Sequence, residues 1–297
     1  MKRIAVVVAL LSAGAARPDA AVVGYAQDGD APVIPYLRAV AAGSGLELRE
    51  RRLLGDAEVI AAVARREVDV AIAPAELAIA ARARGVPVVL VAGVSASRAR
   101  ILARKELEID RVAGLAHRRV GVRRGAAEEM LLLSELRAAS LSWSTDATGD
   151  VQLVYLPTAD LNIALRSRYV DAIVQREPLA ARALGEGAVE LPRTTAPRLE
   201  ALVASEQFYG ERRLLGRIVR CLVDGARLAE RSSPLERLLW ATPPPAEPLL
   251  VGSLSDAYVA DTARSMREFG VGGSPAAGST RELVRLDLLA EVAGPAM

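Results

Sequence analysis

Three turns in the sequence combine residue types that suit a ligand-holding junction between a strand and a helix. They are Ala73-Pro74-Ala75, Arg124-Gly125-Ala126-Ala127 and Pro157-Thr158-Ala159. In an open α/β sheet, ligands bind outside the carboxyl ends of the strands. There the free N–H groups of a helix start favour an anionic or carbonyl-bearing group, and Gly125 permits close backbone approach. Because every α/β protein contains such turns, an ordinary connection is the alternative at each of them.

Residues for covalent or metal chemistry are scarce. Cys221 and His117 are the only cysteine and histidine, which excludes an intrachain disulfide, a cysteine zinc site and most hydrolase triads. We expect Cys221 to be a buried small side chain and His117 a solvated loop residue. The chain also lacks the Gly-x-Gly-x-x-Gly, Walker, His-Glu-x-x-His and Gly-x-Ser-x-Gly motifs. These absences favour a binding protein without catalytic residues, metal or cofactor over an enzyme.

Composition indicates a folded chain with an aliphatic core. The 297 residues are 52% hydrophobic but only 3% aromatic, and they suffice for one large or two medium domains. The net charge is +2, from 38 basic and 36 acidic residues. Arginine is scattered without a basic stripe, so we expect no nucleic-acid partner.

The elements that must position the turns alternate between short apolar runs and Ala/Leu/Arg-rich runs, which is typical of an α/β fold with largely parallel sheets. We predict helices at 32–42, from Asp56 as N-cap to 66, at 75–83, at 126–138, and from caps at Thr158 and Asp160 to 168. We predict strands, or extended segments, at 21–25, 46–52, 68–72, 86–91, 100–104, 119–122, 151–156 and 170–174.

Two of these predicted units repeat one pattern. Arg66-Glu67-Val68-Asp69 and Arg168-Tyr169-Val170-Asp171 each follow a capped helix and precede an apolar strand, a proline and an Ala/Arg helix. The agreement of these features indicates two similar halves.

Beyond residue 195 the pattern changes. We expect 199–228 to be mostly helical, Thr242-Pro243-Pro244-Pro245 to be a break, and helices to follow at 253–269 and 280–292. Outside the apolar run at the N-terminus, no stretch of the chain reaches membrane-spanning length.

The N-terminus is typical of an export signal. Basic Met1-Lys2-Arg3 precedes an apolar run at 4–16 that contains the small-residue site Ala13-Gly14-Ala15. We expect residues 1–20 to be a signal peptide, cleaved near Ala15 or Ala20. A buried first strand at 4–10 is the alternative.

Several segments together resemble solute-binding proteins of ABC transporters, of the nitrate/sulfonate/taurine type and its relatives that bind pyrimidine precursors of thiamine. The resemblance runs from about Val22 to Val292. The segments that carry it are Val23-Gly24-Tyr25, residues 67–74, residues 86–92, residues 118–122 with Gly125, Val154-Tyr155-Leu156-Pro157, and residues 170–173 with Glu177-Pro178.

The resemblance implies a type II periplasmic-binding clamshell, in which two doubly wound α/β lobes are joined by a two-segment hinge. Lobe 1 would comprise residues 21–103 plus 195–297, and lobe 2 residues 104–194. Closure would bury a solute, and the closed form would dock on a membrane permease. The implied ligand-binding residues are Tyr25, Gln27, Ala73, Pro74, Ala75, Ser95, Gly125, Ala126, Ala127, Thr158, Gln175 and Glu177.

The sequence departs from that family at the predicted pocket. Ala126 and Ala127 stand where anion-binding members usually carry hydroxyl residues, and Gln175 stands where many carry a large aromatic side chain. Both departures argue against nitrate or a simple alkylsulfonate. Glu177 is expected either to recognise an amine or to hold the hinge through a salt bridge, and Tyr25 either to contact the ligand or to serve the lobe interface.

Three functions are therefore compared. The first is the substrate-binding component of an ABC uptake transporter, periplasmic and monomeric. The second is an enzyme on the same fold, of the pyrimidine or menaquinone pathway type, although this chain lacks the Cys-rich motif of the pyrimidine synthases. The third is a ligand-sensing lobe of a regulatory system.

Overall fold

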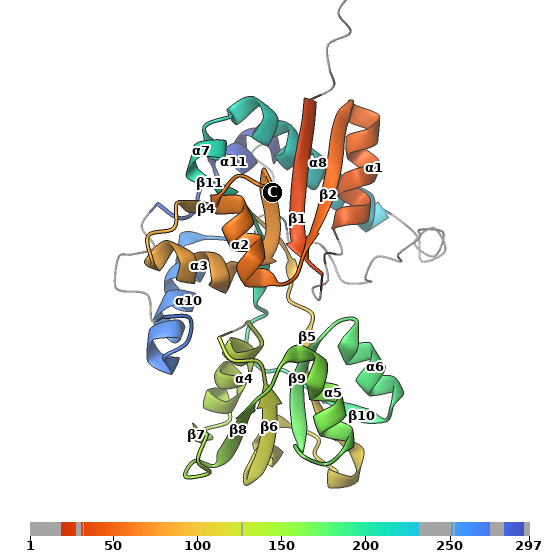
Figure 1. Cartoon of the computed structure of the whole chain (residues 1–297), viewed down its shortest axis with the longest axis vertical. Helices are drawn as coiled ribbons and strands as arrows, with labels where there is room; N and C mark the ends of the chain where they lie inside the picture. Colours follow the sequence, from red (N-terminus) through yellow and green to blue (C-terminus); the bar gives the residue numbers. More distant parts are fainter. Residues whose placement is uncertain are drawn as a thin grey trace, which may run out of the picture.

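The computed structural model describes residues 19–27, 31, 33–125, 127–231, 251, 253–273 and 282–293. They form two α/β lobes stacked along the longest axis of the molecule and joined by two crossing segments (Figure 1). The predicted signal segment, apart from 19 and 20, the predicted break at 242–245 and Ala126 lie outside the described residues.

Lobe 1 contains a five-stranded sheet with β1 between β2 and β3. Strands β1, β2 and β3 are parallel, and β11 lies antiparallel between β3 and β4. The strands in sheet order are β2 (Leu46–Leu53), β1 (Asp19–Ala26), β3 (Val70–Pro74), β11 (Leu199–Ser205) and β4 (Val88–Ala96).

Helices cover both faces of this sheet (Figure 1). On one face, buried residues of α1 (Ile34–Ser44), α8 (Arg212–Arg231) and α11 (Asp287–Ala293) share a single apolar cluster. On the other, α2 (Asp56–Ala64), α3 (Ala75–Ala83) and α10 (Asp256–Phe269) share a second cluster that continues into lobe 2. The short α7 (Glu206–Tyr209) links β11 to α8.

Lobe 2 has the same plan. Its strands in sheet order are β10 (Ala188–Leu191), β5 (Ala99–Arg104), β9 (Ala172–Arg176), β6 (Arg118–Val122), β8 (Val151–Tyr155) and β7 (Trp143–Ser144). Helix α4 (Ala127–Ala138) covers one face, and α5 (Thr158–Arg166) and α6 (Leu179–Gly185) cover the other. Two 3₁₀ turns, η1 (Lys105–Leu107) and η2 (Val112–Leu115), connect β5 to β6.

The repeated sequence pattern is repeated in three dimensions. Asp69 accepts a hydrogen bond from the backbone N–H of Val22 in β1 at 2.7 Å, and Asp171 accepts one from Arg119 in β6 at 3.0 Å. Arg66 and Arg168 have φ angles of 58° and 62°, so the chain leaves both helices through the same left-handed turn. The prediction of two similar halves is confirmed.

The two crossing segments fix the boundaries of the lobes. The chain leaves the first sheet at Ala96 and enters the second at Ala99, because β5 pairs with β9 and β10. Residues 99–103, which the sequence analysis expected in lobe 1, therefore belong to the sheet of lobe 2. The return crossing at 192–198 is anchored to α4, where Glu135 accepts hydrogen bonds from the backbone N–H and hydroxyl groups of Thr194 and Thr195 at 2.6–3.1 Å.

Three sequence predictions are wrong. Residues 282–286, expected within a helix at 280–292, are not helical, because Leu283 and Arg285 form backbone hydrogen bonds with Leu90 of β4, and α11 begins only at Asp287. Residues 199–205 form the strand β11 rather than the start of a long helix, because the sheet offers a vacant position between β3 and β4 that outweighs the helical composition. Neither Asp56 nor Thr158 caps its helix, since Gly55 and Pro157 occupy the N-cap positions without a side-chain cap. Asp56 is instead free to bond outside its own helix.

Candidate functional site

The site begins at the edge of the lobe 1 sheet where its parallel strands end. Asp56 is the first residue of α2, after β2, and Glu76 lies in the first turn of α3, after β3. Strand β11 enters at the same edge, and Glu200 pairs in register with both Pro74 and Ser95. Because directly opposed residues project to the same side of a sheet, the side chains of Glu200 and Ser95 lie side by side.

The corresponding edge of lobe 2 supplies a second set of charged groups. Arg123 and Arg124 follow β6, Glu128 lies in the first turn of α4, and Arg176 is the last residue of β9.

Arg176 joins the two edges through a buried ion pair. Its guanidinium donates to both carboxylate oxygens of Asp56 in lobe 1, and its Nε lies 2.6 Å from Oε1 of Glu128. The exposed fractions of Arg176, Asp56 and Glu128 are 7%, 2% and 4%. Burial alone lowers the pKa of Arg176, but the two carboxylates outweigh it and raise that pKa, so the guanidinium stays charged. Arg123 adds a second contact to Asp56 at 3.5 Å.

Arg198, immediately before β11, makes another contact between the lobes. Its Nη2 donates to the hydroxyl of Ser134 in α4, and its Nε lies 3.7 Å from Oε1 of Glu76. The second distance is that of an ion pair and is too long for a hydrogen bond.

Several buried acceptors at this junction have no hydrogen-bond donor among the residues that the structure describes. They are both carboxylate oxygens of Glu76, Oε2 of Glu128 and the hydroxyl of Ser95. Two buried donors at the same junction, Nε of Arg176 and Nε of Arg198, also lack a hydrogen bond there. Burial raises the pKa of Glu76, against the opposing effect of Arg198. Burial and then Asp56 raise the pKa of Glu200 well above its usual value. A buried polar atom without a partner is costly, which points to a group that the site is built to receive.

Four of the predicted ligand-binding residues lie at the lobe 1 edge. Ala73, Pro74 and Ala75 form the buried turn between β3 and α3, and Ser95 lies near the end of β4. Strand β11 brings them together, since Glu200 pairs with Pro74 on one side and Ser95 on the other. The sequence therefore predicted this edge of the sheet, but it did not predict the charged residues that lie there.

Tyr25 and Gln27 are held within lobe 1. The hydroxyl of Tyr25 donates to Glu50 at 2.8 Å and accepts from Nε of Arg52 at 3.0 Å. Gln27 is exposed at the end of β1, and its backbone N–H donates to the carbonyl of Leu53 at 2.7 Å. Neither residue contacts the buried Arg176 ion pair.

Gly125, Ala127 and Thr158 surround the strand ends of lobe 2. Gly125 has a φ of 71° and donates its N–H to Glu129 at 2.5 Å. A cavity of ≈ 640 Å³ extends from Arg123 and Arg124 to Pro157, Thr158 and Ala159. Beside it, Tyr155 donates to Glu129 at 2.6 Å under the guanidinium of Arg124; burial and then Glu129 raise the pKa of Tyr155 to about 12.

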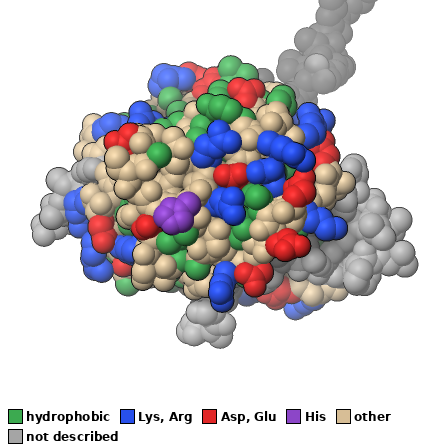
Figure 2. Space-filling view, turned by 90° about the horizontal axis from the view of Figure 1, so that it is seen from below, with side chains coloured by type: hydrophobic (Ala, Val, Ile, Leu, Met, Phe, Trp, Pro, Cys, Tyr) green, Lys and Arg blue, Asp and Glu red, His purple; other side chains and the backbone are tan. Residues whose placement is uncertain are grey.

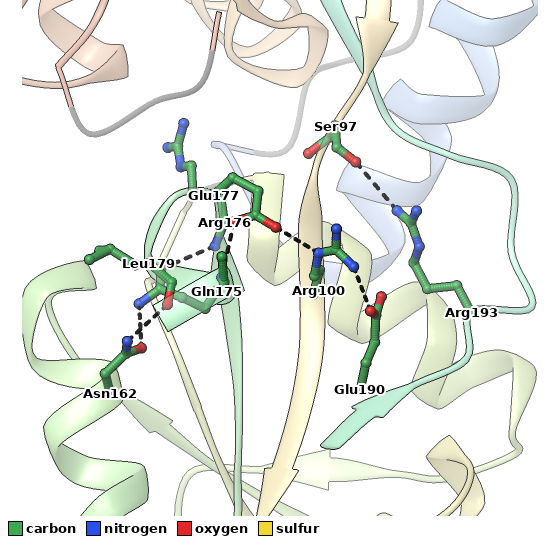
Figure 3. Close-up of polar contacts among 10 residues, drawn as sticks. Ser97, Arg100, Asn162, Gln175, Arg176, Glu177, Leu179, Glu190 and Arg193 are labelled. Atoms are coloured by element: carbon green, nitrogen blue, oxygen red, sulfur yellow. Dashed lines mark hydrogen bonds and ion pairs between the residues drawn. The ribbon is translucent and has the colours of Figure 1, made fainter. Parts of the chain in front are cut away.

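Gln175 and Glu177 are engaged within lobe 2 and its crossing strand. The amide of Gln175 donates to the carbonyl of Thr158 at 3.0 Å and to Asn162 at 3.1 Å. Glu177 accepts from Nε of Arg100 at 2.9 Å, and Figure 3 shows Arg100 between Glu177 and Glu190 on the crossing strand. Glu177 therefore forms a salt bridge, as its second interpretation expected, but with a residue of the lobe 2 sheet beside the crossing segment.

The crossing segments also contact each other. Arg193 of the return segment donates to the carbonyl of Ser97 at 3.4 Å (Figure 3). A third link is α10, which packs on α3 of lobe 1 and α4 of lobe 2. There Phe269 lies edge-on to Trp143, with ring centroids 5.6 Å apart.

Sequence reasoning missed the charged residues that the two lobes bring together. These are Asp56, Glu76, Glu128, Arg176, Arg198 and Glu200. A signal was present, because three acidic residues occupy the first turns of helices that follow strands: Asp56 and Glu76 in lobe 1 and Glu128 in lobe 2. Acidic residues in a first turn already have a local explanation in the helix dipole, so the sequence offers no reason to pair them with distant arginines.

Other features constrain the chemistry. Among the described residues, no three or more His, Cys, Asp or Glu side chains are grouped to hold a metal ion. Across the same ranges, every helix is too short or too polar to span a lipid bilayer. Basic and acidic side chains are interspersed on the surface viewed from the lobe 2 end (Figure 2).

Two α/β lobes that meet at the carboxyl ends of their parallel strands define a clamshell architecture (Figure 1). The sequence matches the NMT1/THI5-like family over residues 42–221. The chain belongs to this family, as the resemblance implied.

Solved structures share the fold at low identity. The periplasmic aliphatic sulphonate binding protein SsuA from Escherichia coli is 19% identical, with a TM-score of 0.72 over 90% of this chain and 92% of that one. The periplasmic nitrate-binding protein NrtA from Synechocystis PCC 6803 is 13% identical, with a TM-score of 0.69 over 92% and 88%. These likenesses confirm the predicted periplasmic-binding clamshell.

One enzyme has the same architecture. The desulfurization enzyme DSZB is 16% identical, with a TM-score of 0.65 over 93% of this chain and 99% of that one. The fold alone therefore leaves both binding and catalysis open. No curated protein matches this sequence significantly.

Proposed function

We propose that this protein is the substrate-binding component of an ABC uptake transporter, which captures a small solute between its lobes and releases it unchanged to a membrane permease. The carrying observation is the buried cluster at the junction, where Arg176 of lobe 2 bonds to Asp56 of lobe 1 beside acceptors that lack donors. Groups divided between two lobes in this way are completed only when the lobes close, which couples solute binding to closure.

The relatives support a transport role, since SsuA and NrtA are described as sulphonate-binding and nitrate-binding periplasmic proteins. A periplasmic location accords with the basic and apolar N-terminal residues of this chain. We further propose that it acts as a monomer, because a clamshell needs only its own two lobes to enclose a solute.

Catalysis is the second candidate, since DSZB shares the fold. The usual nucleophile and base lie away from the junction. Cys221 is buried in α8, with its sulfur 3.6 Å from the hydroxyl of Ser44, and His117 precedes β6 at the end of that strand opposite Arg123. An enzyme would have to use the buried carboxylates for acid–base work.

The test is equilibrium dialysis of the purified protein against a mixture of small metabolites, followed by mass spectrometry of both compartments. Uptake binding predicts that a solute is retained and recovered unchanged, and that small-angle scattering shows a more compact protein in its presence. Consumption of the retained solute would contradict the proposal and favour the enzyme. Recovery of the native protein from cytoplasm with Met1 intact would contradict export.

A further inference from the structure

We propose that Gln175 is a positioning residue, which holds the end of β9 so that the neighbouring Arg176 reaches Asp56 across the junction. Gln175 acts together with Asn162 of α5 rather than through contact with the solute. The inference rests on the proposed function, in which joining the two lobes captures the solute. It gives a part in that joining to a residue that the family resemblance implied as a ligand contact.

The end of β9 extends beyond one of its neighbouring strands. β9 pairs with β6 at Ala172 and Ile173, whereas its pairing with β5 continues as far as Arg176. Among the described residues, the last part of β9 therefore has a strand partner on one edge. Backbone that is held by fewer hydrogen bonds opens more readily, so a further contact is needed to fix the position of Arg176.

Gln175 supplies this contact through a chain of amide hydrogen bonds (Figure 3). Its Oε1 accepts from the backbone N–H of Arg176 at 3.1 Å. Its Nε2 donates to the carbonyl of Thr158 at 3.0 Å and to Oδ1 of Asn162 at 3.1 Å. Asn162 in turn donates to the carbonyl of Leu179 at 2.9 Å. The end of β9 is thereby tied to the first residues of both α5 and α6.

The orientation of both amides is determined by this chain. Turning either amide over would bring two donors or two acceptors face to face. Gln175 and Asn162 are 1% and 8% exposed, so an unmatched polar atom there would lose its hydrogen bond without gaining water. Both amide hydrogens of Gln175 are bonded to the protein, which leaves neither of them for a solute.

Gln175 and Arg176 point to opposite faces of the sheet, because successive side chains of a strand alternate. Gln175 lies on the face covered by α5, to which it is bonded. Arg176 lies on the face covered by α4, where its Nε is 2.6 Å from Oε1 of Glu128 and its guanidinium reaches Asp56 of lobe 1. The influence of Gln175 on the junction therefore passes through the backbone of β9.

The competing explanation is that Gln175 stabilises lobe 2 alone. In that case, loss of its hydrogen bonds loosens β9 and α5 and leaves lobe 1 unchanged. A positioning role predicts an effect in α2 of lobe 1 as well, because Asp56 is the first residue of that helix and the partner of Arg176. The two explanations thus differ in where the protein loosens.

The experiment measures hydrogen–deuterium exchange of the purified full chain by mass spectrometry of its peptides. Gln175→Met keeps an unbranched side chain and removes its hydrogen-bonding amide. We expect the amides of α2 to exchange about threefold faster or more, as partial loss of one buried hydrogen-bonded contact predicts. Asn162→Leu is a milder second variant, in which Gln175 keeps its bonds to Thr158 and Arg176. It should change exchange in α2 in the same direction by a smaller factor, and it decides the question if Gln175→Met does not fold.

Two controls locate the cause of the effect. In an Asp56→Ala background, Gln175→Met should no longer change exchange in α2, since the contact that it weakens is already absent. Asp171→Ala removes hydrogen bonds immediately before β9, at the end of that strand opposite Gln175. It should raise exchange in lobe 2 and leave α2 unchanged.

Two outcomes would overturn the positioning role. One is faster exchange confined to lobe 2 in both Gln175→Met and Asn162→Leu. The other is an equal increase in α2 when Asp56→Ala is also present. Either outcome would leave the transport function standing, because that function is judged by whether a retained solute is recovered unchanged. Conversion of the solute would contradict transport and would leave the exchange result as it is.

Discussion

Arg176, the last residue of β9, and Asp56, the first residue of α2, form an ion pair that joins the two lobes and is almost completely buried. The two residues are 120 positions apart in the sequence. Glu128 shares the guanidinium from the lobe 2 side. Within this ion pair, one arginine balances two carboxylates, one from each lobe.

Replacing Arg176 with methionine should destabilise the protein by about 3–5 kcal/mol, because Asp56 and Glu128 lose their shared buried cation. Urea unfolding measures the change. Arg49→Met is the matched control, since Arg49 forms an exposed pair with Glu47, and such pairs contribute little to stability. Adding Asp56→Asn and Glu128→Gln to Arg176→Met should restore part of the loss, and equal effects of the two arginine variants would contradict the buried role.

Glu135 should make the protein sensitive to acid. Burial opposes ionisation of Glu135, but hydrogen bonds from Thr195 and Thr194 outweigh it and lower the pKa. A lowered folded-state pKa gives stability that is present above the unfolded value, about 4.3, and is lost as pH falls through the folded value. Unfolding free energies measured between neutral pH and about pH 3 should decline less steeply in Glu135→Gln, and an unchanged slope would contradict this prediction.

Glu200 should act in the opposite direction. Burial and the facing carboxylates Asp56, Glu76 and Glu128 raise its pKa, against the opposing effect of Arg176. The folded protein then retains a proton that the unfolded chain releases above about pH 4.3, so this contribution to stability falls as pH rises toward the folded value. Melting temperatures across this window should vary less with pH in Glu200→Gln than in the parent protein.

Asp69 and Asp171 offer a test of the equivalence of the lobes. Asp69→Ala leaves the N–H of Val22 without its acceptor and should cost about 1–3 kcal/mol. Asp171→Ala should cost more, since that carboxylate also accepts from Arg104 at 2.6 Å. Asp261→Ala, on the exposed side of α10, should change stability by less than about 0.5 kcal/mol in chemical denaturation. Similar losses of stability at all three positions would contradict the structural role assigned to the hydrogen bonds of Asp69 and Asp171.

The sequence predicted much of the fold because buried parallel strands are continuous apolar runs with clear ends. Strand β3 and helix α3 follow their patterns closely, and the turns at Arg66 and Arg168 match as expected. Strand β11 was missed for a physical reason. Leu199-Glu200-Ala201-Leu202 has a helical composition, and its partners Pro74 and Ser95 are distant in sequence, so only tertiary pairing makes it a strand.

The candidate site was predicted less completely. Local patterns located the strand ends at Ala73–Ala75 and Ser95, because a strand-to-helix turn is a local feature. Charge complementarity between lobes is not local. Nothing near Asp56 indicates Arg176, since the contact exists only after both lobes have folded and closed.

The position of β11 has a consequence for synthesis on the ribosome. All strands of lobe 2 lie between residues 99 and 191, so that lobe has its complete sheet as soon as this stretch emerges. Lobe 1 starts first but finishes later, because β3 and β4 do not pair with each other and must await β11 at 199–205. While all of lobe 2 is being synthesised, the edges of β3 and β4 that will pair with β11 therefore remain unpaired in the nascent chain. During that interval the chain is most exposed to aggregation or to chaperones.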